Sequence, residues 1–180
     1  RLGLRLIKGL SEAAGQRIHT AQRQRAFANV ADLRQRACLD RGDMEALAAA
    51  DALSGISGNR YQSHWQTMAR EAHRPLLPYY SAAQRSKDDA AVTAAPTLPE
   101  DVVADYQSTG LTLRSHPLSL LRHQPPFDRC RRQTELETLG NHRFVRVAGL
   151  VTCRQRPGTA SGVVFLTLED ETGNINVIVW

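Results

Sequence analysis

The chain has 180 residues, of which 42% are hydrophobic, and it carries a formal net charge of +5 at pH 7. This length suits one or two domains, and the hydrophobic content is enough for a buried core. No run of apolar residues approaches the roughly 20 that a membrane-spanning helix needs, and no signal peptide is recognisable. We therefore expect no membrane association and a cytoplasmic protein.

The positive charge comes almost entirely from arginine, because Lys8 and Lys87 are the only lysines. A guanidinium group is a better fork for phosphate than an ammonium group, and it stacks better on bases. The bias therefore favours a nucleic-acid partner. A GC-rich genome, which replaces lysine by arginine throughout, would produce the same bias, so composition alone leaves both explanations open.

The three cysteines, Cys38, Cys130 and Cys153, are odd in number and widely spaced. No pair has the short spacing that is typical of metal ligands. We therefore expect reduced thiols in the cytoplasm and no metal site.

The first 72 residues read as several short helices separated by tight turns. An apolar start is interrupted at Lys8–Ser11, and a helix is predicted from Glu12 with Ser11 as its N-cap. Three further helices are predicted: one that opens at Val30, one that is capped by Asp43 and ended by Gly55 and Gly58, and one over Tyr61–Ala72. This pattern favours a small bundle over a coiled coil.

The turn at Gly9 is the candidate phosphate-binding element of this bundle. A glycine–hydrophobic–glycine turn between short helices exposes backbone N–H groups, which can bind a DNA phosphate without reading sequence. The candidate residues are Lys8, Gly9, Leu10, Ser11, Gly15 and Arg17. Ser11 stands where a second glycine would be, and Glu12 brings a negative charge to the phosphate position. The alternative is an ordinary helix–helix turn in which Gly9 is only a C-cap.

Basic charge is concentrated in two regions of the chain. Residues 1–37 contain eight basic side chains against Glu12 and Asp32, and residues 114–156 contain nine arginines against three acidic residues. The stretch Ser86–Asp105 between them is acidic and rich in Ala, Thr and Pro. Two basic modules on either side of a connector are typical of a nucleic-acid binder with two contact sites.

The last part of the chain carries three strand signals, at Phe144–Cys153, Val163–Glu169 and Ile175–Trp180. A turn at Asp170–Asn174 joins the last two, and its Gly173 can adopt a positive φ without steric cost. Three consecutive strands with this spacing predict the first half of a five-stranded oligonucleotide-binding (OB) barrel. Because the chain starts at Arg1 and stops after the third strand, we expect a piece of a longer protein.

Alternation along the second and third strands predicts which side chains face outward. If the aliphatic residues line the barrel interior, Phe165 and Trp180 lie on the outer surface, where they can stack on bases. The loop predicted from Arg154 to Gly162 offers Arg154 and Arg156 as phosphate contacts. For the two aromatics, the alternative is burial under a loop or a neighbouring domain. For the two arginines, the alternative is a loop that is simply solvated, because its sequence would look the same.

Four stretches carry a resemblance to a known family: RLGLRLIKGLSEAAGQRI, LAAADAL, DVVADYQSTGLTLRSHPL and VAGLVTCRQRPGTASGVVFLTLEDETG. They resemble the C-terminal part of bacterial error-prone DNA polymerase III alpha subunits, the C-family polymerases of damage-induced mutagenesis. The likeness covers nearly the whole chain in the same order and is weakest from Ala69 to Pro99. Its most specific parts are the loop RQRPGTA and the turn FLTLEDETG.

The resemblance implies an α+β fold in four parts. Residues 1–72 would be a tandem helix-hairpin-helix DNA-binding region and residues 73–110 a connector. Residues 111–143 would be a helical and loop segment, and residues 144–180 the truncated N-terminal part of the OB domain. The piece would bind duplex and single-stranded template DNA within a polymerase of translesion synthesis and repair.

The resemblance also implies what this piece lacks. In the family, the PHP domain and the palm with its catalytic aspartates lie upstream, so we expect no catalytic residue here and no cofactor, with Mg²⁺ bound in the palm. At the place of the sliding-clamp motif of replicative relatives, this chain has His73–Tyr80 with two prolines and no glutamine. Clamp contact would therefore be indirect, through a protein partner of a mutagenic complex.

A second class of protein fits the same residues. A stand-alone adaptor of recombination or repair could also combine a helix-hairpin-helix region with an OB barrel. The coding sequence upstream of Arg1 would distinguish the two, because only the polymerase has a palm there.

Overall fold

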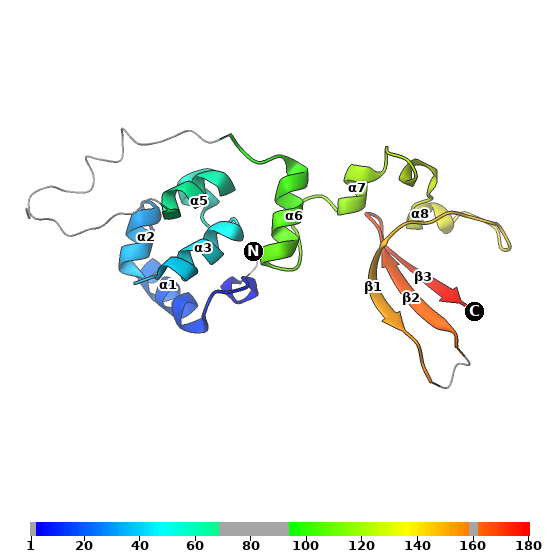
Figure 1. Ribbon diagram of the computed structural model, residues 1–180, viewed down its shortest axis with the longest axis horizontal. Coiled ribbons are helices and arrows are strands. Elements are labelled where there is room, and N and C mark those ends of the chain that lie inside the picture. The colour runs from blue at the N-terminus through cyan, green and yellow to red at the C-terminus, as the bar shows by residue number, and fades with distance from the viewer. Residues whose placement is uncertain (1–2, 69–93, 159–161) are drawn as a thin grey trace, which may run out of the picture. The chain divides into compact units, whose positions relative to one another are not determined.

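The structure is a computed structural model that describes residues 3–68, 94–158 and 162–180. The chain divides into two compact units, Arg1–Leu111 and Thr112–Trp180. The first, unit 1, is helical, and the second, unit 2, contains the strands (Figure 1). The predicted α+β class, helices first and three strands last, is confirmed.

Unit 1 is built from short helices. A 3-10 helix, η1, covers Leu4–Leu6, and the α-helices that follow are α1 (Glu12–Gln24), α2 (Val30–Arg36), α3 (Arg41–Ala49), α4 (Ser54–Ser57), α5 (Arg60–Met68) and α6 (Leu98–Ser108). Helix α1 begins where it was predicted, because the Ser11 side chain accepts a hydrogen bond from the Ala14 N–H.

The N-cap predicted for the next long helix was wrong by three residues. Helix α3 begins at Arg41, and Asp40 is its N-cap, since the Asp40 carboxylate accepts a 2.8 Å hydrogen bond from the Asp43 N–H. Asp43 lies in the first turn instead, where it is buried and pairs with Arg17. Both aspartates suit a helix start, so composition alone did not distinguish them.

The core of unit 1 is one apolar cluster supplied by α1, α2, α3 and the segments that flank them. Its members are Ile7, Ala14, Ile18, Ala21, Val30, Leu33, Ala37, Leu39, Met44, Leu47, Ala48 and Leu53. In α1 the spacing of Ala14, Ile18 and Ala21 places them on one side of the helix. The exposed side of α1 is left with polar residues.

Helix α6 belongs to unit 1, although it lies within the segment 73–110 that was predicted as a connector. The buried Arg60 side chain donates to the Asp101 carbonyl and carboxylate, at 3.0 and 2.8 Å, and to the Asp105 carboxylate. These bonds join α6 to the start of α5. A buried guanidinium in such a place requires paired carboxylates, and α6 supplies them.

Helices α2 and α3 end in the same way. After each helix one residue adopts a positive φ, Cys38 at 49° and Asp51 at 55°. The Leu39 N–H donates to the Arg34 carbonyl at 3.0 Å, and the Cys38 N–H donates to the Gln35 carbonyl at 3.3 Å. These two bonds form a Schellman motif, in which glycine is the usual residue at the positive-φ position.

Unit 2 contains short helical segments followed by a sheet. They are α7 (Pro117–Leu121), the 3-10 helix η3 (Phe127–Arg129), α8 (Gln133–Leu136), β1 (Leu150–Gln155), β2 (Val164–Glu169) and β3 (Asn174–Val179). The strands form one antiparallel sheet in the order β1–β2–β3. This order agrees with the first three strands of an OB barrel.

The first strand is shorter at its start, and longer at its end, than was predicted. Residues 144–149 precede β1, while Arg154 and Gln155, predicted as loop, pair with Leu166 and Phe165 of β2. The register shifts between Val151 and Cys153, so Thr152 is an extra residue in β1. Such a bulge reverses the facing of every later side chain of the strand.

Gly173 has a different role from the one predicted. Its φ is not among the positive values in the described part of the chain. A Cβ at this position would instead lie 2.9 Å from the Gln133 Oε1 atom and 3.1 Å from its Cδ atom. A larger residue at this position would therefore make the Gln133 side chain move away from the turn.

None of the helices in the described ranges is long and apolar enough to cross a membrane.

Candidate nucleic-acid interface

The turn between η1 and α1 has the geometry of a hairpin that exposes backbone N–H groups. Gly9 has a φ of 85°, which lets the chain reverse direction before α1. Ser11 caps α1 and occupies the Ala14 N–H. The N–H groups of Glu12 and Ala13, in the first turn, have no acceptor within the helix. Together with the helix dipole they make this end of α1 attractive to an anion.

Lys8 is tied to α6. Its ammonium group donates to the carbonyl oxygens of Gln107 and Tyr106, at 2.9 and 3.2 Å, and its N–H donates to the Ser108 carbonyl at 2.9 Å. These acceptors lie at the C-terminal end of α6, where a positive charge is favourable. Lys8 is exposed, but its predicted role as a phosphate ligand has to coexist with this structural one.

Arg17 is likewise held in place. Its guanidinium donates to the carbonyls of Ala37 and Cys38, at 2.9 and 3.3 Å, and to the Asp43 carboxylate at 3.3 Å. Its side chain is still 42% exposed. Gly15, two residues before it, has open space around the position of a Cβ. Arg17 therefore presents a fixed positive charge one turn beyond the hairpin.

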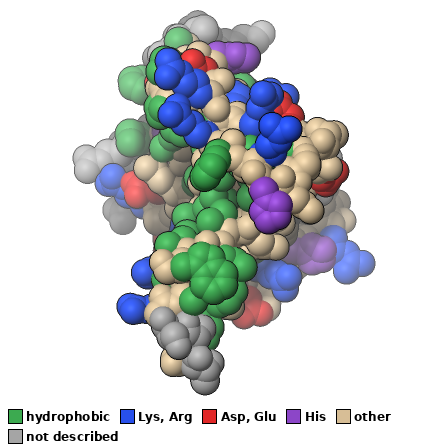
Figure 2. Space-filling model, turned by 90° about the vertical axis from the view of Figure 1, so that its right-hand side faces the viewer, with side chains coloured by type: hydrophobic (Ala, Val, Ile, Leu, Met, Phe, Trp, Pro, Cys, Tyr) green, Lys and Arg blue, Asp and Glu red, His purple; other side chains and the backbone are tan. Residues whose placement is uncertain are grey.

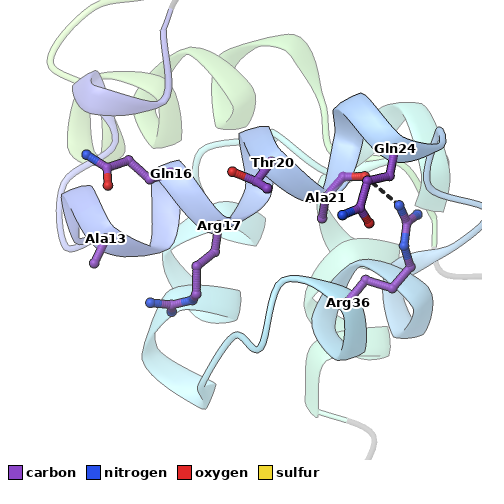
Figure 3. A pocket seen from close by; sticks show the side chains of 7 residues that line it. All are labelled: Ala13, Gln16, Arg17, Thr20, Ala21, Gln24 and Arg36. Carbon is purple, nitrogen blue, oxygen red and sulfur yellow. Dashed lines mark hydrogen bonds between the residues drawn. The ribbon is translucent and has the colours of Figure 1, made fainter.

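An open hollow of about 440 Å³ runs along the exposed side of α1 (Figure 3). Its lining is polar in part and consists of Ala13, Gln16, Arg17, Thr20, Ala21 and Gln24 from α1 and Arg36 from α2. Arg36 donates to the carbonyls of Ala21 and Arg25, and its guanidinium lies over the Phe27 ring. The hollow thus has a fixed arginine from each helix.

The outward-facing aromatics of the sheet are accessible. Phe165 pairs with Ile178 of β3 and is 39% exposed, and Trp180, directly after β3, is 93% exposed. Alternation places Phe165, Ile178 and Trp180 on the same side of the sheet. Exposed hydrophobic side chains also gather on the face that Figure 2 displays.

Arg154 does not lie on the same face of the sheet as Phe165. Arg154 pairs with Leu166, so it lies on the aliphatic face of the sheet, and Arg156 follows the end of β1. Without the bulge at Thr152, Arg154 would pair with Phe165. Both arginines are exposed.

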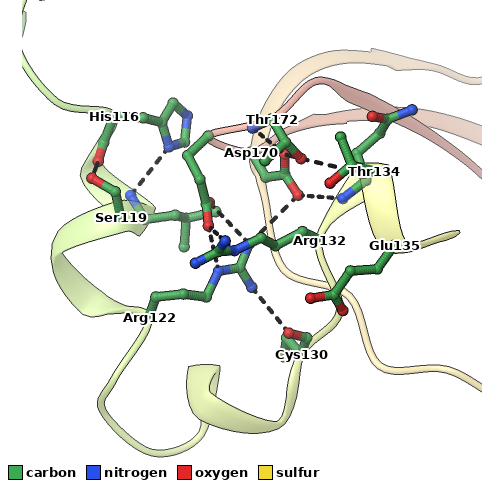
Figure 4. Close-up of polar contacts among 12 residues, drawn as sticks. His116, Ser119, Arg122, Cys130, Arg132, Thr134, Glu135, Asp170 and Thr172 are labelled. Atoms are coloured by element: carbon green, nitrogen blue, oxygen red, sulfur yellow. Dashed lines mark hydrogen bonds and ion pairs between the residues drawn. The ribbon is translucent and has the colours of Figure 1, made fainter.

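A polar network that sequence reasoning missed fixes the turn between β2 and β3 (Figure 4). Arg122 directly follows α7 and is buried. Its guanidinium donates to both Glu171 carboxylate oxygens, at 2.8 and 3.0 Å, and to the Cys130 carbonyl at 3.3 Å. The buried Asp170 carboxylate lies 3.5 Å from Arg122. Asp170 also accepts from the N–H groups of Thr172, Gly173 and Gln133, at 2.7 to 3.0 Å. Arg122 and Glu171 are 49 positions apart in the sequence, which explains why no local pattern indicated this pair.

The network keeps both carboxylates ionised. Burial opposes ionisation of Asp170, but the hydrogen bonds from Thr172, Gln133 and Gly173 outweigh it and hold the pKa below its ordinary value. For Glu171, the hydrogen bonds from Arg122 lower the pKa more than burial raises it. In turn, Glu171 raises the pKa of Arg122. The turn therefore contains a charged, hydrogen-bonded centre at neutral pH.

One earlier expectation concerns residues that the structure does not describe: the segment His73–Tyr80, which was considered for clamp contact. Among the residues that the structure describes, no group of three or more His, Cys, Asp and Glu side chains is arranged to hold a metal ion.

Comparison with known proteins first defines a class. A family model for the helix-hairpin-helix motif matches residues 1–63, from the start of the chain through the hairpin at Gly9 and into α5. Residues 1–63 of unit 1 thus carry the helix-hairpin-helix motif, which agrees with the predicted fold class.

The particular relatives are more specific. The chain is 50% identical over 180 residues to the error-prone DNA polymerase of Teredinibacter turnerae, 49% identical to that of Saccharophagus degradans, and 50% identical over 181 residues to that of Pseudomonas fluorescens. Each match covers 100% of this chain and 17% of the relative. The predicted resemblance is confirmed: the chain is related from end to end to one segment of error-prone DNA polymerases.

Proposed function

We propose that this chain is the non-catalytic, DNA-binding portion of an error-prone DNA polymerase that acts in translesion synthesis and DNA repair. The observation that carries the proposal is the identity of about half of all residues, over the whole chain, to proteins of that name. A helix-hairpin-helix domain at residues 1–63 supplies the link to DNA. The end-to-end match favours a polymerase over a stand-alone adaptor.

In this proposal unit 1 binds duplex DNA. The N–H groups at the start of α1 would contact a phosphate, while Arg17 and Arg36 supply fixed positive charge along the same helix. Such contacts follow the backbone and carry no base information. Lys8 would contribute charge from its place at the end of α6.

Unit 2 would bind the single-stranded template. Phe165 and Trp180 are exposed aromatics on one side of the sheet, and stacking on them requires unpaired bases. Arg154 and Arg156 are exposed at the end of β1 and would contact phosphates from this strand end, with Arg154 on the opposite face of the sheet from Phe165. The four-part division of the chain, the reading of residues 144–180 as the opening of an OB domain, and its C-terminal place in the polymerase belong to the same proposal.

The remaining roles follow from the proposed polymerase. DNA synthesis, with its Mg²⁺, would be performed by the palm of the complete enzyme, in the cytoplasm. Contact with the sliding clamp would pass through a protein partner of the mutagenic complex.

The test is a titration of the full-length protein with duplex and single-stranded oligonucleotides at two salt concentrations. Binding without sequence preference and with a steep loss at the higher salt is expected, because phosphate contacts release counterions. Binding that is insensitive to salt, or no binding at low salt, would refute the proposal.

The division between the units can be tested with substitutions that leave the fold intact. Gly15→Glu places a negative charge in open space beside the hairpin, and Gly15→Ala is its neutral control. Both replacements favour the helix, so reduced duplex binding by Gly15→Glu alone would not reflect unfolding. In unit 2, Phe165→Ala should weaken single-strand binding, and Phe165→Leu shows how much of the loss is due to stacking. Equal losses on both substrates would contradict the division.

A further inference from the structure

The segment before β1 exposes an aromatic ring between arginines. Residues 143–146 read Arg-Phe-Val-Arg, and Phe144 is fully exposed, with a relative exposure of 108%. Arg143 and Arg146 are exposed as well. The first strand of the OB barrel was predicted to begin here, but β1 starts only at Leu150. An exposed phenylalanine beside charged residues needs an explanation other than the core of unit 2.

A second arginine-bearing segment lies directly beside this one. The Arg131 N–H donates to the Arg146 carbonyl at 2.8 Å, and Arg131 and Val147 form a parallel β-bridge. In an extended segment Arg143 lies about 10 Å from Arg146. The bridge thus brings the backbone of Arg131 beside that of Arg146, so three arginines, Arg131, Arg143 and Arg146, lie in the two segments that meet next to Phe144.

The buried network holds the backbone of this second segment rigidly on both sides of Arg131. On one side, the Cys130 carbonyl accepts a 3.3 Å hydrogen bond from Arg122. On the other, the Gln133 N–H donates to the Asp170 carboxylate at 2.8 Å. A surface whose backbone is fixed beforehand loses less entropy on binding.

The charges of these three arginines are only partly balanced. Arg131 has an exposed ion pair with Glu135 at 3.3 Å, and the other acidic side chains of the region are Asp128 and Glu137. Within the described ranges Arg143 and Arg146 form no ion pair. An exposed pair such as Arg131–Glu135 costs little to break, so Arg131 remains available to an anion.

We propose that Arg131, Arg143, Phe144 and Arg146 form a second binding surface for single-stranded DNA, which we call the RFVR surface. Arginines bind phosphates of both single-stranded and duplex DNA, but a fully exposed phenylalanine stacks only on an unpaired base. The surface is formed by residues that precede β1, whereas Phe165 lies in β2. This inference rests on the proposed function, since it assigns a further contact to the same DNA.

The test measures single-strand affinity of the full-length protein with Phe144→Ala, and with Leu113→Ala as control. Leu113 is another exposed hydrophobic residue of unit 2, at 73%, and lies outside the surface. Phe144→Ala should weaken binding to a single-stranded oligonucleotide about tenfold and leave duplex binding unchanged. Leu113→Ala should change neither. An oligonucleotide without bases should bind the Phe144→Ala variant and the parent equally.

The arginines are tested by salt dependence. Arg143→Gln with Arg146→Gln should make the slope of log affinity against log salt shallower by about 0.7 for each lost contact. Arg41→Gln, which removes an exposed arginine of unit 1, serves as the charge control.

The outcomes separate this inference from the proposed function. If the parent binds no DNA, the proposed function fails as well. If the parent binds and both sets of variants bind equally well, only the RFVR surface is refuted. A Phe144→Ala variant that loses thermal stability but no affinity would show that Phe144 is covered by another part of the protein, which also overturns the proposal.

Discussion

Unit 1 and unit 2 are each stabilised by a different kind of internal contact. In unit 1 twelve apolar side chains form one buried cluster, from Ile7 to Leu53. In unit 2 the buried hydrophobic residues among those described are Leu118 and Ile175, and the charged pair Arg122 and Asp170 is buried as deeply. Unit 1 therefore has its own hydrophobic core. Unit 2 relies on a polar network that fixes one turn.

The difference bears on what each unit can do alone. The aliphatic face of the sheet is partly open, since Val151 is 59% and Val179 47% exposed. Such a face gains stability only when further strands cover it. We therefore expect the stability of unit 2 to be the most sensitive to substitutions in its buried polar network, and the following predictions test this.

The largest effect is expected from Arg122→Ala. It removes the partner of Glu171 and leaves the buried Asp170 charge without its neighbour, at a cost of about 3–5 kcal/mol. Hydrogen exchange of the amides in β2 and β3 should speed up, while that of α1 stays unchanged. Arg132→Ala is the matched control, because exposed Arg132 pairs with the same Glu171 at 3.1 Å and should cost under about 1 kcal/mol. Equal effects of the two variants would contradict the importance of the buried pair.

Leu47→Ala tests the core of unit 1. Leu47 is buried in the middle of the cluster, so the cavity should cost about 2–5 kcal/mol. Urea denaturation followed by hydrogen exchange should show loss of protection in α1 and α3, with β2 and β3 unaffected. Val103→Ala, on the exposed side of α6, should have little effect. If Leu47→Ala also unfolded the sheet, the two units would not be independent.

Acid should weaken unit 2 before unit 1. The pKa values of Asp170 and Glu171 are lower in the folded protein than their ordinary values of 3.8 and 4.5. The unfolded chain therefore takes up more protons as the pH falls. The stabilisation is complete above about pH 4.5 and is lost as the pH drops through the folded values. Amide protection measured at decreasing pH should disappear first in the turn at residues 170–173. If the amides of this turn stayed protected to a lower pH than the amides of α1, the expected order would be refuted.

The smallest effect is expected at the end of α2. Cys38 has a φ of 49°, which glycine adopts without strain. Cys38→Gly should stabilise unit 1 by up to about 1 kcal/mol, and Cys38→Ala should not. Thermal unfolding of both variants measures the difference. A gain with alanine equal to that with glycine would mean that the thiol, and not the backbone conformation, is unfavourable.

Local patterns predicted much of this fold, and contacts between distant residues account for the rest. The start of α1 follows from Ser11 and Glu12, and the three strands follow from runs of β-branched residues. The bulge at Thr152 was not predictable, because it depends on pairing with β2.

The same limit applied to the candidate site. The hairpin at Gly9 was recognisable because its residues are consecutive. The ties of Lys8 to Gln107 and Ser108 involve residues a hundred positions away, and no local spacing indicates them. The RFVR surface was concealed for a related reason: its residues resemble the start of a strand, and only the structure shows that Phe144 is exposed.

The bond between Arg60 and α6 has a consequence for synthesis of the protein. When α5 leaves the ribosome, Asp101 and Asp105 have not yet been translated, so a side chain destined for burial has no counterion. Unit 1 can close only after Ser108 has emerged, because the Ser108 carbonyl then also becomes available to Lys8. A transcript interrupted before α6 would therefore yield an incompletely folded product and a substrate for proteases, even though the hairpin itself had been made in full.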